Sequence, residues 1–294
     1  MGYSARYHAA SLAAVFLALA VGILIGAGLG DNLLSDTEGN LRESLEGDIE
    51  DARGEADDLQ LQLDRERAFA DRAYPALVGD TLSQRRIGVV ALGDLPGSVS
   101  GDVESALEPS GAELAEVVVV RVPPDTPALG AELGPGFAVI ETDGGLLEDL
   151  SQRLGGQLVL GGGNQLDKVR DVLVTRSSGE GGRLDGVVLV RAPRGEFGPE
   201  DEAATRALEE GLVSGVADAG IPAVAVERSD VDDSSIPFFA PFDVATVDSI
   251  DLASGRLALV FALLGADGNF GIKETANTLL PELLEPAQGD GREP

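Results

Sequence analysis

The sequence of 294 residues contains no cysteine, which excludes disulfides, thiolate metal sites and cysteine-based zinc fingers. It contains one histidine, His8, and one methionine, Met1. A serine nucleophile activated by histidine needs both side chains in one site, and His8 precedes a long apolar run. Histidine-based catalysis is therefore excluded for everything after that run, and we expect no enzymatic activity.

Basic residues are scarce, because 21 Lys and Arg stand against 51 Asp and Glu, giving a net charge of −30. All acidic residues, and every basic residue except Arg6, follow position 30. A field of this sign repels nucleic acids and anionic lipids, so we exclude a nucleic-acid-binding role. The simplest interpretation is a solvated acidic surface that favours solubility.

Glycine-rich segments also fall short of the known nucleotide-binding motifs. Residues 161–163 are three glycines without the lysine of a phosphate-binding P-loop. Residues 93–97 follow a predicted strand, but they lack the dinucleotide-binding spacing, and Pro96 removes an amide donor. A ligand at the carboxyl ends of the strands stays open on fold grounds alone.

Carboxylate pairs are present, as at Asp232-Asp233 and at Asp248 with Asp251. Such pairs suit hard cations and acid–base chemistry, but chance proximity is expected among 51 acidic residues. We therefore predict no catalytic residue, no resident metal site and no bound cofactor. At residues 248–251 we expect a side-chain N-cap for the helix predicted to start at Leu252.

A membrane helix is predicted at residues 9–30, which carry no charge. At about 1.5 Å per residue this run spans about 33 Å, enough for a hydrocarbon core of about 30 Å. Arg6 precedes the run, and acidic residues follow it, so residues 1–8 are expected in the cytoplasm and the remainder outside. The competing interpretation is a cleaved signal peptide with a small-residue site at residues 26–28, although signal cores are usually only about 7–15 residues long.

Two features favour association of several chains. Gly22, Gly26 and Gly30 recur every four residues and give one helix face that admits a second helix closely. Residues 31–74 form a predicted coiled-coil stalk, with a weak, alanine-rich seam. Its a and d positions are Leu45, Ile49, Ala52, Ala56, Leu59, Leu63, Glu66, Ala70 and Ala73. We expect a homo-oligomer, the alternative being a single amphipathic helix packed on the domain, and a helix end at Tyr74-Pro75.

The remainder, residues 75–287, reads as an α/β domain with a mostly parallel, Rossmann-like sheet covered on both faces. Apolar β-branched runs predict strands at residues 87–92, 117–122, 137–141, 187–190 and 223–226. Periodic patterns predict helices at residues 99–107, 146–158, 200–219 and 252–264, the second of them interrupted by Gly155-Gly156. The polar residues 288–294 are expected to be a disordered tail.

Several segments resemble the mycobacterial copper transport protein B (MctB) family, an actinobacterial type of envelope protein. Residues 8–20 (HAASLAAVFLALA) are typical of its anchor helix, and further similarity lies at residues 246–248 (TVD), 255–260 (GRLALV) and 268–273 (GNFGIK). The order of helix, coiled coil and α/β domain also matches. The resemblance implies a single-pass membrane protein in copper transport or efflux and in copper homeostasis.

The donor chemistry of the chain bears on that role. Copper(I) prefers sulfur ligands and copper(II) prefers imidazole, and the residues after position 30 offer neither. One helix per chain encloses no pore, so a channel would require an oligomer. The alternative function is a non-catalytic envelope scaffold that recruits or regulates a cell-wall or cell-division enzyme.

Overall fold

The computed structural model describes residues 4–193 and 195–282, with side chains described at residues 7–26, 44–193 and 195–282. The chain divides into two compact units, Met1–Glu66 and Arg67–Pro294. The predicted disordered tail, residues 288–294, lies outside the described residues. So do the side chains of Arg6 and of the acidic residues 31–38 on which the predicted orientation depends.

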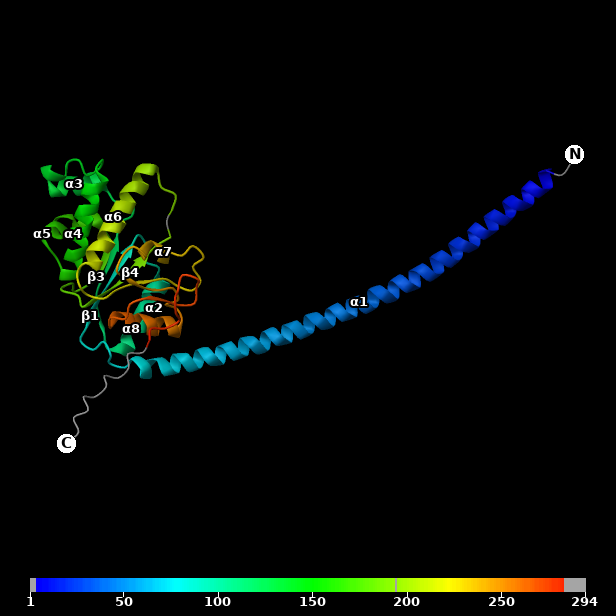
Figure 1. The fold of residues 1–294 in the computed structure, drawn as a ribbon, viewed down its shortest axis with the longest axis horizontal. Helices are drawn as coiled ribbons and strands as arrows, with labels where there is room; N and C mark the ends of the chain where they lie inside the picture. The colour runs from blue at the N-terminus through cyan, green and yellow to red at the C-terminus, as the bar shows by residue number, and fades with distance from the viewer. Residues whose placement is uncertain (1–3, 194, 283–294) are drawn as a thin grey trace, which may run out of the picture. The chain divides into compact units, whose positions relative to one another are not determined.

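The first unit consists of helix α1 (Ser4–Val78), whose last turns belong to the second unit (Figure 1). Within it, Tyr7–Gly26 has a mean hydropathy of 2.5 and exposed side chains. Among the described residues it is the one helix long and apolar enough to cross a membrane. Gly22 and Gly26 have open space where a side chain would begin, as a glycine contact face requires, and the surroundings of Gly30 are not described.

Helix α1 continues past Pro75 to Val78, so the helix end predicted at Tyr74-Pro75 is wrong by one turn. Proline in the last turn removes only one hydrogen bond. Packing supports this turn: the Tyr74 hydroxyl donates to the Ala106 carbonyl at 2.6 Å, and Val78 is fully buried. Arg256 lies 5.3 Å from the Tyr74 ring centroid and pairs with Asp71.

A seven-stranded sheet forms the centre of the second unit. Its order is β3-β2-β1-β4-β5-β6-β7, and every pair is parallel except β2 with β3. This arrangement confirms the mostly parallel α/β fold. The strands are β1 (Arg86–Leu92), β2 (Glu113–Val120), β3 (Val174–Gly179), β4 (Gly186–Arg191), β5 (Ala223–Val226), β6 (Ala245–Val247) and β7 (Asn269–Phe270).

Helices cover both faces of this sheet (Figure 1). One layer holds α3 (Thr126–Leu133), α4 (Gly144–Leu160), α5 (Asn164–Leu173) and α6 (Pro199–Ala217). The other holds α2 (Gly97–Leu107) and α8 (Ala253–Leu263), and the short α7 (Ile236–Phe239) follows β5. Successive residues of β1 alternate between the layers: Val90 and Leu92 pack with α4 and α6, whereas Val89 and Ala91 pack with α2 and α8. The apolar runs are therefore buried on both sides.

The strand predicted at residues 137–141 is wrong. A 3₁₀ helix (Pro135–Phe137) and turns occupy this segment, and the Ile140 amide donates to the Phe137 carbonyl at 3.1 Å, not to a strand. The predicted interruption at Gly155-Gly156 is also wrong, because α4 runs unbroken. A Cβ at Gly155 would lie 2.3 Å from the Leu212 carbonyl oxygen, so this glycine lets α4 and α6 pack closely.

Candidate functional site at the carboxyl edge of the sheet

Strands β1 and β4 are neighbours, and the chain continues from them in opposite directions along the sheet, from β1 to β2 on one side and from β4 to β5 on the other. The strand order therefore reverses between β1 and β4. Outside the carboxyl ends of the strands, such a switch point opens a crevice between the diverging connections. Two cavities lie here, of about 590 Å³ and about 230 Å³. Ala192 and Pro193, directly after β4, line both of them.

The larger cavity lies over the ends of β1, β2 and β4 and the start of the antiparallel β3. Gly93 follows β1 with a φ of +95°, a conformation that favours glycine and turns the chain at the cavity wall. Of the residues that the structure describes, four charged ones line the cavity: Asp94, Arg121, Arg176 and Glu209. A ligand at the carboxyl ends of the strands, which the fold class allows, would occupy this cavity.

Two of these residues, Arg121 and Arg176, line the side of the cavity next to β2 and β3. The Arg121 Nε donates to the Val172 carbonyl at 2.9 Å, and the Arg176 guanidinium donates to the Leu95 carbonyl at 3.2 Å. Among the described side chains, no carboxylate forms an ion pair with either. A backbone carbonyl thus holds each guanidinium in place, and each guanidinium has further N–H groups that can donate.

One residue that lines the larger cavity, Glu209, belongs to a buried ion pair with Arg191. Glu209 of α6 is 1% exposed and accepts from Arg191 at 3.0 Å. The Arg191 guanidinium carbon lies 4.2 Å from the Phe238 ring centroid, a cation–π distance. Glu209 is therefore neutralised locally, although it faces the cavity.

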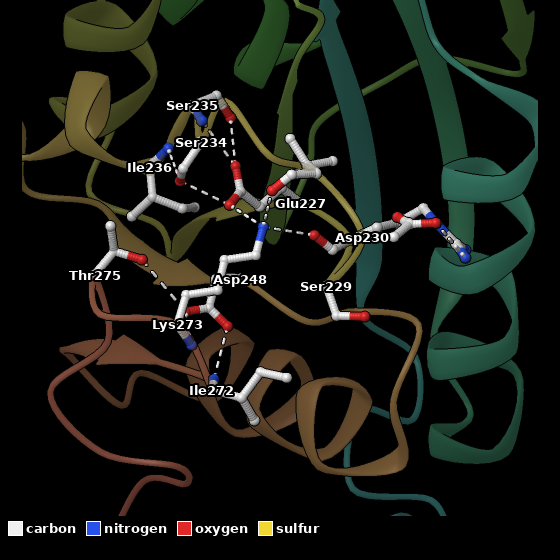
Figure 2. Close-up of polar contacts among 12 residues, drawn as sticks. Glu227, Ser229, Asp230, Ser234, Ser235, Ile236, Asp248, Ile272, Lys273 and Thr275 are labelled. Carbon is white, nitrogen blue, oxygen red and sulfur yellow. Dashed lines mark hydrogen bonds and ion pairs between the residues drawn. The ribbon is translucent and has the colours of Figure 1, made fainter. Parts of the chain in front are cut away.

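A buried polar cluster borders the smaller cavity and is drawn in Figure 2. The Lys273 ammonium donates to the Glu227 carboxylate and to the carbonyls of Arg228 and Val231, each at 2.8 Å. The same carboxylate accepts from the Ser234 hydroxyl at 2.7 Å and from the Ser235 amide at 2.8 Å. All three ammonium protons are thus used, and the cluster fixes the loop after β5.

Asp248, directly after β6, holds the chain beyond β7 in place (Figure 2). Its carboxylate is 1% exposed and accepts from the amides of Ile272 at 2.8 Å and Lys273 at 3.0 Å. A Cβ at Gly271 would lie 1.7 Å from an Asp248 oxygen, so only glycine fits there. The predicted N-cap at residues 248–251 is wrong, because α8 starts at Ala253 without a side-chain cap hydrogen bond.

The predicted carboxylate pairs have separate partners. Asp251 accepts from the Ser229 amide at 2.7 Å and hydroxyl at 2.6 Å. Partial burial raises the pKa of Asp251, but hydrogen bonds from Ser229 and from its own backbone amide, together with the charge of Arg228, outweigh burial, so the pKa lies below its ordinary value. Of Asp232 and Asp233, only Asp233 lines the smaller cavity. In the part of the chain that the structure describes, no group of three or more carboxylate or imidazole ligands could hold a metal ion.

The remaining segments singled out in the sequence have structural roles or belong to the first unit. Gly161 ends α4 with a φ of +82°, and Gly163 precedes α5, so the triple glycine makes a helix–helix turn. His8 belongs to the apolar helix of the first unit. No sequence pattern pointed to Arg121, Arg176 or Glu227, because only the fold gathers them at one edge, and Lys273 belonged to a segment of family resemblance without a role of its own.

Comparison with models of protein families gives a match over most of the chain. The family model described as "Copper transport outer membrane protein, MctB" matches residues 3–134 and 147–281. The first matched segment includes the apolar helix, β1 and β2, and the second includes the strands from β3 to β7. No curated protein matches the chain.

Proposed function

This chain belongs to the MctB copper transport outer membrane protein family, and from that membership we propose that it acts in copper transport across the cell envelope as a membrane-anchored oligomer. The observation that carries the proposal is the family match over both units of the chain. One helix long and apolar enough to cross a membrane, Tyr7–Gly26, supports the anchoring part. A non-catalytic role fits a transport family.

The chemistry of copper limits how the protein acts. No cysteine, histidine or methionine follows position 30, so the α/β domain offers no soft ligand for copper(I). A single helix cannot enclose a pore by itself. Copper would then cross through an assembly of several chains or through a partner protein, with the α/β domain outside the cytoplasm as the part that partners contact.

The orientation is tested by reporter fusions. A reporter active only outside the cytoplasm should work when fused after Pro294, and a reporter active only in the cytoplasm should work at residue 2, because Arg6 retains the N-terminus. The reverse pattern would contradict the orientation. A tag at residue 2 that separates from the rest of the chain would show instead that the helix is a cleaved signal peptide.

The role itself is tested by deletion. A strain lacking this protein should tolerate less copper than its parent, and the full chain should restore tolerance. The scaffold alternative predicts a different result, namely defective cell separation with unchanged copper tolerance, since a recruited cell-wall or cell-division enzyme would be misplaced. Unchanged copper tolerance in the deletion strain would remove the basis of the proposed role.

A further inference from the structure

The larger cavity has the position and size of a small-molecule site. It lies outside the carboxyl ends of β1, β2 and β4, at the point where the strand order reverses. Its volume of about 590 Å³ falls within the range of roughly 300–1,000 Å³ that ligand sites occupy. The family match assigns no ligand to this place.

The charge of this cavity is opposite to that of the chain. The chain carries −30, yet among the residues that the structure describes two guanidiniums, Arg121 and Arg176, line the cavity against one carboxylate without an ion pair, Asp94. The other lining carboxylate, Glu209, is already paired with Arg191. The cavity therefore attracts anions locally within a protein that repels them generally.

The two guanidiniums are also preorganised. Each donates to a backbone carbonyl, Arg121 to Val172 and Arg176 to Leu95, which holds the planar groups without consuming all their donors. A guanidinium fork matches the paired oxygens of a phosphate or carboxylate. We infer that the larger cavity binds a small multivalent oxyanion, bearing phosphate or carboxylate groups, through Arg121 and Arg176.

The test uses the full chain in detergent micelles and isothermal titration with two probes, pyrophosphate and citrate. Saturable binding of at least one probe, at about one per chain, is expected. The R121Q/R176Q variant should bind at least about tenfold more weakly, since each charge-assisted pair is lost. Tighter binding of pyrophosphate assigns a phosphoryl ligand, and tighter binding of citrate assigns a carboxylate ligand.

A matched control separates local contacts from overall charge. R153Q/R183Q also removes two positive charges, but from exposed arginines that line neither cavity. It should leave the affinity nearly unchanged. D94N should tighten binding severalfold, because it removes the opposing charge while its amide oxygen still accepts from the Leu95 amide. This second variant keeps the test decisive if R121Q/R176Q fails to fold. No saturable binding of either probe, or equal loss in R153Q/R183Q, would overturn the inference.

Discussion

Replacing Lys273 with Met should lower the free energy of unfolding by about 3–5 kcal/mol, because it leaves the carboxylate of Glu227 buried without its counter-ion. The Glu227 side chain is 5% exposed and Lys273 is 17% exposed. The variant also removes a hydrogen-bond donor from the carbonyls of Arg228 and Val231. For a domain of this size the melting temperature should fall by roughly 10 °C. Thermal unfolding followed by circular dichroism measures the effect.

The only other lysine, Lys168, provides the control. It is exposed on α5, and Lys168→Met should change stability by no more than about 0.5 kcal/mol. The double variant Glu227→Gln/Lys273→Met should recover part of the loss, because neither buried charge then remains alone. Equal melting temperatures for the two single lysine variants would show that the buried pair contributes little.

The central strands could be predicted from sequence because their physical signal is local. Residues 87–92, 187–190 and 223–226 are continuous apolar runs, and the structure places them as neighbouring, doubly covered strands β1, β4 and β5. Strand β3 could not be predicted in this way. Five of its six residues are exposed, and residues 175–178 are all polar, so it has no apolar alternation and is recognised only by its antiparallel pairing with β2.

The polar cluster and the cavity depend on contacts between residues far apart in the sequence. Glu227 and Lys273 are separated by 46 positions, and Arg121 meets the carbonyl of Val172 across 51. Asp248 looked like a helix cap because an acidic residue shortly before a helix usually is one. Its real partners are amides beyond β7, which no local sequence pattern could place next to it. Local sequence patterns thus predict individual helices and strands, whereas predicting the site would require knowing how all the strands align in the sheet.

The second large effect concerns the stalk: Leu59→Asp/Leu63→Asp should abolish crosslinking between full-length chains in the membrane. Both leucines occupy the predicted seam, and in the single chain they are 53% and 51% exposed. Pairing would remove this apolar area from water, and a buried aspartate at either position opposes it. The seam is weak, but anchoring all chains in one membrane raises their effective concentration. Crosslinking in isolated membranes, read on a denaturing gel, measures the loss.

Leu61→Asp is the matched control for the seam. Leu61 is 49% exposed in the same helix, two residues from each seam leucine, but it falls on the opposite face of the heptad. This variant replaces one leucine with one negative charge, as Leu59→Asp and Leu63→Asp each do singly, so comparison with those single variants separates the seam from general effects of charge on an acidic stalk. We expect Leu61→Asp to crosslink like the unchanged chain. If it loses crosslinking as fully as Leu59→Asp/Leu63→Asp, the chains do not pair through this seam, and the proposed oligomer must assemble through the glycine face of the apolar helix or through the α/β domain.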